Sequence, residues 1–290
     1  MQARLLRRLP LLAVPLVLVL PFVLSACGEK SEPTGASIRL YPLSVHDADG
    51  HLITLRAKPR SIAVAGGAGI ELASALRLPV TRVGTGSGDL NLGSMRRLKP
   101  QLAFVGSGIA KIAVEKARAL GIAVYAVPDQ TLDGIAQALS DGSLLAGVPL
   151  RGRTERARLA EGRESVRTAL AAVKPVRVFI DLGRFTTASD SSFIGSIINE
   201  AGGIDVAGPD AQEGPFPLKR LRRLRPEVLV VGTDSQLTLA KLRHDPATRW
   251  LPAVRSGRLV RVNTQLLEPG PAAVDGLREL AAALHPDAFR

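Results

Sequence analysis

The sequence has few of the residues that build metal, redox or base-stacking sites. It contains one cysteine, four histidines and 3% aromatic residues among 290 positions. A single cysteine excludes an internal disulfide framework. Four scattered histidines argue against a bare-metal centre, which needs several ligands that converge. Scarce aromatic residues argue against nucleic acid as a partner, because single strands bind by stacking bases on aromatic rings.

Motifs for two common enzyme classes are also missing. The sequence has no G-x-S-x-G segment of the kind that carries a nucleophilic serine, and no histidine follows a predicted strand in the C-terminal half. Residues 66–69 read GGAG, but Leu72 stands where a dinucleotide-binding fingerprint has its third glycine. We therefore expect no catalytic residues, no bound cofactor and no metal site.

The N-terminus has the order of an export signal. Arg4, Arg7 and Arg8 precede an uncharged apolar run over residues 11–24, and small residues then lead to Cys27. Residues 24–27, LSAC, resemble the lipobox of bacterial lipoproteins, which implies that Cys27 is lipidated after cleavage. A single transmembrane anchor is the alternative, but the run is shorter than the roughly 20 residues needed to span a bilayer, and two prolines interrupt it.

Composition shifts divide the rest of the chain. We expect a signal peptide over 1–26, a lipidated flexible tether over 27–37, an N-terminal lobe over 38–148, a linking helix over 149–174 and a C-terminal lobe over 175–290. The formal net charge of +12 indicates an anionic solute or an anionic membrane surface as a partner.

Short β-branched runs alternate with helical patterns in both lobes, which is typical of βα units around parallel sheets. We expect a hairpin over 37–55 and a final helix over 271–284. The expected strands are 61–65, 81–84, 102–105, 122–127, 176–181, 228–231 and 259–262. The longest helical pattern, 149–173, has an apolar stripe at Leu159, Val166, Leu170 and Val173, and its length suits a stiff strut between two lobes.

One segment occurs twice. Residues 95–107 read MRRLKPQLAFVGS and residues 221–233 read LRRLRPEVLVVGT, and the two align without gaps. The proline ends a helix, the apolar run is a buried strand, and the Gly-hydroxyl pair opens a loop at the carboxyl end of that strand. Ligands bind at that edge of open α/β sheets, although such joints also recur by chance.

These segments resemble the Fe/B12-type periplasmic substrate-binding proteins of ABC importers. The matching segments run in the family's order: DADGHLITL at 47–55, KPRSIAV at 58–64, RLKP at 97–100, LGI at 120–122, SFIG at 192–195, NEAGG at 199–203, WLPAV at 250–254 and PGP at 269–271. The resemblance implies an α/β fold of two Rossmann-like lobes with mostly parallel sheets, joined by one long rigid helix. Ligand binding should therefore move the lobes little.

The resemblance also implies a function. We expect a receptor that captures an iron-siderophore, haem or cobalamin between its lobes and delivers it to an ABC permease with its ATPase. The protein should be monomeric and lipid-anchored on the extracytoplasmic face of the cell membrane. Glu71 is the candidate for docking on the permease, although a plain surface position suits it as well. Lys219 departs from the family, which often has a second docking glutamate there. A non-transport lipoprotein of the same fold is therefore the alternative, and an exported enzyme is a weaker one.

Loops after the predicted strands supply the candidate ligand-binding residues. The candidates are Gly67, Ala68, Ser87, Asp89, Ser107, Arg184, Phe185, Thr186 and Ser235. Arg184 leads because a guanidinium offers planar donors for carboxylate, hydroxamate or phosphate oxygens, although a solvated position is the plain alternative. Phe185 either lies against an organic ligand or packs in the core, and Tyr125 is the other aromatic expected nearby. Trp250 is interpreted as structural. A solvated helix face, or else a partner or lipid surface, is expected for the basic cluster of Lys219, Arg220, Arg222, Arg223 and Arg225.

Overall fold

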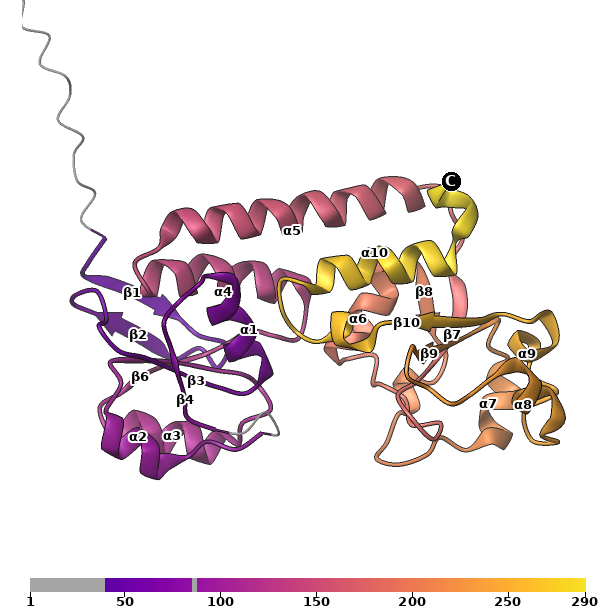
Figure 1. Ribbon diagram of the computed structural model, residues 1–290, viewed down its shortest axis with the longest axis horizontal. Helices are drawn as coiled ribbons and strands as arrows, with labels where there is room; N and C mark the ends of the chain where they lie inside the picture. Colours follow the sequence, from indigo (N-terminus) through magenta and orange to yellow (C-terminus); the bar gives the residue numbers. More distant parts are fainter. Residues whose placement is uncertain (1–39, 85–87) are drawn as a thin grey trace, which may run out of the picture. The chain divides into compact units, whose positions relative to one another are not determined.

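Two four-stranded parallel sheets organise the chain. The computed structural model describes residues 40–84 and 88–290, so the predicted signal peptide, tether and Cys27 lie outside it. One sheet has the strand order β4-β3-β5-β6 and the other β10-β9-β7-β8 (Figure 1). This arrangement confirms the predicted α/β class, with two lobes of parallel strands joined by a long helix. No helix in the described part of the chain is long and apolar enough to cross a membrane.

The first lobe opens with an antiparallel hairpin and continues as βα units. Its elements are β1 (Leu43–His46), β2 (Leu52–Leu55), β3 (Ile62–Ala65), α1 (Gly67–Ala75), β4 (Thr81–Arg82), α2 (Leu92–Leu98), β5 (Leu102–Val105), α3 (Lys111–Ala119), β6 (Ala123–Ala126) and α4 (Leu132–Leu145). Alternate residues of β5 face opposite layers. Leu102 and Phe104 pack in the cluster that holds α1 and α4, whereas Ala103 and Val105 pack in the cluster that holds α2 and α3. Both faces of the sheet are therefore covered, which explains why β3, β5 and β6 are apolar throughout, whereas the short edge strand β4 is polar and exposed.

The second lobe repeats this plan. Its elements are β7 (Val176–Asp181), α6 (Phe193–Glu200), β8 (Gly203–Asp205), α7 (Leu218–Leu224), β9 (Val228–Gly232), α8 (Leu239–His244), α9 (Pro252–Ser256), β10 (Leu259–Val262) and α10 (Ala273–Leu284), with short 3₁₀ turns at Gly208–Asp210, Thr264–Leu267 and Pro286–Phe289. Helices α6 and α10 cover one face of the sheet, and α7, α8 and α9 cover the other. The short edge strand β8 was not predicted.

The repeated segment has the same structure in both lobes. In each copy a seven-residue helix, α2 or α7, ends in a left-handed residue, Lys99 with φ 43° or Arg225 with φ 50°. A buried proline follows, and then a strand with no exposed residue, β5 or β9. The predicted order of helix, proline, strand and Gly-hydroxyl loop is therefore present twice.

Helix α5 (Pro149–Leu170) links the lobes and packs against α4 and α10. Leu159 and Val166 of the predicted apolar stripe are buried, Leu170 is half-buried against the core, and Val173 lies beyond the helix. Gly152 and Gly162 are also buried, and their lack of a side chain allows close helix contact. A Cβ at Gly152 would lie 2.6 Å from the Leu139 carbonyl oxygen of α4. The helix ends at Leu170, short of the predicted Val173, because the chain turns there toward Pro175 and β7.

Candidate functional site

A cavity of about 610 Å³ lies at the carboxyl ends of β7 and β9, where open α/β sheets bind ligands. Three of the predicted residues, Arg184, Phe185 and Ser235, line it together. The other lining residues are Asp181, Leu182, Gly183, Ile194, Gly232, Asp234, Gln236, Leu237, Lys241, Thr264 and Glu268. All of these belong to the second lobe. Thr186, the remaining candidate of that lobe, lies next to the lining but is not part of it.

A tight turn after β7 presents Arg184. The Leu182 N–H donates to the Thr186 carbonyl at 2.8 Å, and the Thr186 N–H donates to the Gly183 carbonyl at 2.9 Å. Inside this turn Arg184 and Phe185 both have left-handed backbones, with φ 52° and 60°. Because non-glycine residues pay for such a backbone, of order 1–3 kcal/mol each, two in succession mark a turn that its surroundings hold in place. The exposed Arg184 side chain therefore starts from a fixed backbone at the rim of the cavity.

Asp181 supports the same turn from below. Its side chain is 5% exposed, and its Oδ1 accepts a hydrogen bond from the Gly183 N–H at 2.9 Å. Burial raises the pKa of this carboxyl, and hydrogen bonds from the backbone of Gly183 and Phe185 partly oppose that rise. Asp181 was predicted only as the end of a strand, because a lone aspartate there carries no signal of its burial.

Phe185 combines the two roles left open by the sequence. Its ring lies 6.3 Å from that of Phe179, which is fully buried in β7, and its carbonyl accepts a hydrogen bond from the Phe216 N–H. The residue is half-buried and also lines the cavity. Phe185 is therefore a wall of the cavity that is anchored in the core.

The lining of the cavity carries mixed charge. Ser235 Oγ accepts a hydrogen bond from the Leu237 N–H at 3.2 Å, and Lys241 Nζ donates to the Gln236 carbonyl at 2.9 Å. The lining thus places two cations, Arg184 and Lys241, among three carboxyl groups. Such a lining suits a solute with both donors and acceptors better than a simple anion. Lys241, Thr264 and Glu268 were not predicted, because their distance along the sequence from Arg184 hides their proximity.

The first-lobe candidates gather around Gly106, at the carboxyl end of β5. A Cβ at Gly106 would lie 3.3 Å from the Ala68 nitrogen and 3.4 Å from Asp129 Oδ2. The Ser107 N–H donates to Asp129 Oδ2 at 2.8 Å, and Gln130 Nε2 donates to Ser107 Oγ at 3.0 Å. Asp129 is 3% exposed and organises this loop cluster, yet sequence reasoning missed it.

Asp89 belongs to the same end of the first sheet. A Cβ at Gly84 would lie 2.2 Å from the Asp89 carbonyl oxygen, and one at Gly88 would lie 2.9 Å from that of Gly108. The loop from β4 therefore lies against the loop from β5. Ser87 falls outside the described residues. None of the first-lobe candidates lines the second-lobe cavity, so a ligand held between both lobes stays a prediction.

Glu71, the predicted docking residue, sits on α1 beside the second lobe. A Cβ at Gly270 would lie 2.9 Å from Glu71 Cβ, and both residues line a cavity of about 280 Å³ together with Gln265, Glu268 and Ala272. The residue is exposed, as docking requires. Its role toward a permease stays a prediction.

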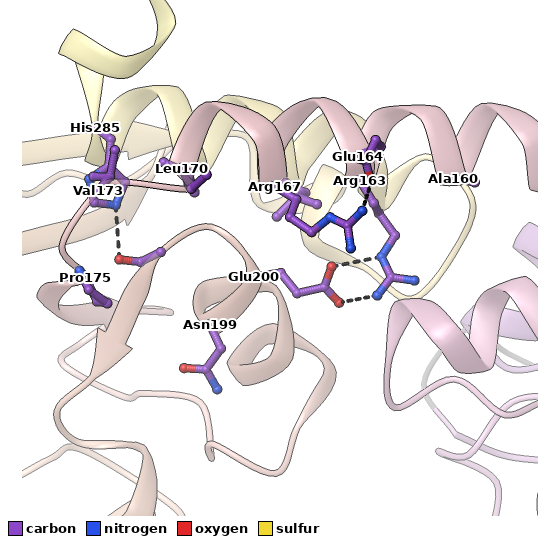
Figure 2. A pocket seen from close by; sticks show the side chains of 13 residues that line it. Ala160, Arg163, Glu164, Arg167, Leu170, Val173, Pro175, Asn199, Glu200 and His285 are labelled. Atoms are coloured by element: carbon purple, nitrogen blue, oxygen red, sulfur yellow. Dashed lines mark hydrogen bonds and ion pairs between the residues drawn. The ribbon is translucent and has the colours of Figure 1, made fainter.

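A further cavity, of about 690 Å³, follows α5 (Figure 2). Arg163 donates to both oxygens of Glu200, at 2.9 and 3.1 Å, and to Asp133 on α4 at 2.5 Å. At the other end a ring nitrogen of His285 lies 3.0 Å from the Gly202 carbonyl oxygen. Because these polar groups are paired within the protein, we interpret this cavity as a structural seam along the linking helix.

The comparisons with known proteins agree with this geometry. No family model matches the chain. A cobalamin-binding protein of Halobacterium salinarum is 26% identical over 209 residues, which is 67% of this chain but only 56% of that relative. An uncharacterized ABC transporter substrate-binding lipoprotein of Bacillus subtilis, YvrC, is 21% identical and covers 94% of this chain and 96% of its own.

Among solved structures, the periplasmic vitamin B12-binding protein BtuF of Vibrio cholerae superposes with a TM-score of 0.67, at 20% identity, over 80% of this chain and 98% of its own. These relatives are named for binding and not for a reaction. The resemblance predicted from the motifs is confirmed. The chain therefore has the two-lobed fold seen in periplasmic binding proteins such as BtuF.

Proposed function

We propose that the chain is an extracytoplasmic solute-binding lipoprotein of an ABC importer, and that it carries a metal chelate of the cobalamin or ferric siderophore type. The observation that carries this proposal is the cavity at the carboxyl ends of β7 and β9, on a fold shared with a vitamin B12-binding protein. A chelate bound there would meet the planar donor of Arg184, the apolar ring of Phe185 and the hydroxyl of Ser235. The loops around Ser107 in the first lobe would complete the grip.

The residue types near the cavity favour a chelate over haem. Proteins hold haem iron with His, Cys, Met or Tyr as axial ligands, and none of these lines the cavity. Tyr125, expected near the ligand, is instead fully buried and donates to Asp141. The Tyr41 hydroxyl donates to the Leu144 and Leu145 carbonyls. A ligand whose metal is already fully coordinated needs no such side chain.

The mixed charge of the lining favours a ligand rich in amides or hydroxamates. Arg184 and Lys241 can donate to carbonyl or hydroxamate oxygens, while Asp234 and Glu268 can accept from amide N–H groups. A buried donor left without a partner weakens binding strongly, so this set selects ligands that present both kinds of group. Corrinoid side chains and siderophore backbones present both.

Tethering through Cys27 would place this receptor beside its permease. The lipobox-like segment and the relative named as a lipoprotein both support lipid anchoring on the extracytoplasmic face. An anchor raises the effective concentration of the receptor at the permease, so weak docking suffices for delivery. The ATPase of the importer would then act through the permease, and the receptor itself would work as a monomer.

The test uses the mature chain, residues 27–290, with Cys27→Ser to prevent lipidation. Thermal unfolding is followed with cyanocobalamin, a ferric hydroxamate, a ferric catecholate or haem. A bound chelate at 100 times its dissociation constant should add about 2.7 kcal/mol to the free energy of unfolding. Haem should show no change in its Soret band. If no chelate raises the unfolding temperature, or if haem alone does, the proposal fails.

A non-transport lipoprotein of the same fold is the second candidate, and Lys219 on α7 favours it. The side chain is exposed where the family often has a docking glutamate, so docking on basic permease residues would be repelled. Co-purification of the lipidated full chain with an ABC permease from its own membranes separates the two functions. Chelate binding without any associated permease would favour the second.

A further inference from the structure

The second lobe carries an exposed tryptophan between arginines. Trp250 is the only tryptophan of the chain and is 50% exposed, which corrects its interpretation as structural. The Arg249 guanidinium carbon lies 5.1 Å from the centre of its ring, and that of Arg222 lies 5.9 Å away. Arg222 and Arg223 lie three and four residues after Lys219, so both are its neighbours on the surface of α7. We call Lys219, Arg222, Arg223, Arg249 and Trp250 the basic tryptophan patch.

The core holds this patch in place. Leu221 on α7 and Leu251, next to Trp250, are 0% and 1% exposed, so both neighbouring segments are anchored from within. The Ala253 N–H donates to the Pro226 carbonyl at 3.0 Å, which joins the tryptophan segment to the end of α7. In Figure 1, α7, α8 and α9 lie together beside the second sheet. The indole is thus held outward by a rigid base.

Within residues 40–84 and 88–290, no carboxylate forms an ion pair with a cation of the patch. Among the described residues, ion pairs on this helix are confined to Arg220, which pairs with Asp210. Two guanidiniums over one ring gain cation–π attraction, but they also repel each other and raise the local positive potential. A dense anionic surface would relieve that repulsion.

We propose that the basic tryptophan patch binds the surface of an anionic lipid bilayer. This inference rests on the proposed tethering of the chain to a membrane through Cys27. Lys and Arg near such a surface are attracted by its negative potential, and tryptophan prefers the zone between headgroups and acyl chains. The patch would orient the tethered lobe on the membrane, and Lys219 would then serve lipid contact at a position where the resembled family often has a glutamate.

The composition of the patch favours lipid over an acidic protein. A stable protein interface has an apolar core that excludes water around its anchor residues. Here a single large apolar side chain stands among cations. The repeat-related helix α2 has the same character, since Leu98 is 46% exposed beside Arg96, Arg97 and Lys99. Isolated apolar tips surrounded by basic side chains suit an interface of headgroups.

The test measures flotation of the mature Cys27→Ser chain with two kinds of vesicles, phosphatidylcholine with phosphatidylglycerol and phosphatidylcholine alone. Binding should need the anionic lipid and should fall as salt rises. Emission of the chain should shift to shorter wavelength, and Trp250 alone reports this shift. Arg222→Gln with Arg249→Gln should weaken binding by about fivefold for each charge removed. Trp250→Ala should weaken it as well.

A matched control removes the same charge elsewhere. Arg153→Gln with Arg156→Gln changes two exposed arginines of α5 that make no ion pair in the described structure, and should weaken binding much less than the patch double variant. If both double variants lost the same amount of vesicle binding, net charge alone would explain the binding, and the proposed role of the patch would be wrong. Binding to polyglutamate without binding to anionic vesicles would overturn it in favour of an acidic protein. Chelate-induced stabilisation, measured on the same variants, tests the proposed function separately.

Discussion

Glycine in the linking helix should be essential to its packing, and Gly152→Ala tests this. An alanine Cβ there would lie 2.1 Å from Ser143 Oγ, 2.4 Å from Ser143 Cβ and 2.6 Å from the Leu139 carbonyl oxygen of α4. Ordinary contacts are about 3.5–4 Å, so the helices must separate by roughly 1 Å. Because one obstacle is backbone, a rotamer change cannot relieve the clash.

The magnitude follows from two opposing effects. Overpacking of a close helix contact costs about 1–3 kcal/mol, and a backbone obstacle places this site at the upper end. Alanine recovers about 1 kcal/mol through its better helix propensity. We expect Gly152→Ala to lower the free energy of unfolding by about 2 kcal/mol. Gly162→Ala should also be destabilising, because its obstacle at 2.2 Å is a methyl group of Val274, a β-branched side chain that is fully buried in α10.

Urea denaturation followed by far-UV circular dichroism measures the effect. For a chain of this size, 2 kcal/mol corresponds to a fall of about 4–8 °C in Tm. Gly67→Ala is the matched control, since no atom lies within 4 Å of its Cβ position at the start of α1. A Gly152→Ala protein as stable as the parent would refute the close-packing argument.

Three further predictions concern single side chains. Arg163→Ala should lower the free energy of unfolding by about 1–2 kcal/mol, because Glu200 loses the partly exposed guanidinium that donates to its carboxylate. Urea denaturation of the parent, Arg163→Ala and Arg163→Lys measures this loss. Equal free energies of unfolding for the three proteins would contradict the prediction. Asp181 has a raised pKa in the folded chain, so the native state binds more protons and stability should fall as pH rises through that pKa. Asp181→Asn should flatten this dependence in denaturation titrations between about pH 4 and 7, and an unchanged profile would exclude Asp181 as its source. Arg184→Ala should weaken chelate binding by about tenfold or more at unchanged Tm, and calorimetry showing parental affinity would remove Arg184 from the site.

Local patterns predicted most of the fold. Strands β5, β7 and β10 begin and end at the predicted residues, because each is an apolar run bounded by polar or turn residues. Helix α5 begins at the predicted Pro149. The edge strand β8 was missed, since three residues that start with glycine and expose Ile204 have no pattern of their own and are a strand only beside β7.

By itself, the sequence determined the βα order, the repeated unit and the loops after the strands, because these depend on neighbours along the chain. Tertiary structure alone decided which side chains of those loops meet. Lys241 and Glu268 join Arg184 at one cavity because the carboxyl ends of β7, β9 and β10 share one edge of the sheet. The tertiary structure also decided that Tyr125 is buried and that Trp250 is exposed. Burial of an aromatic ring depends on elements distant in sequence, and no local pattern encodes that.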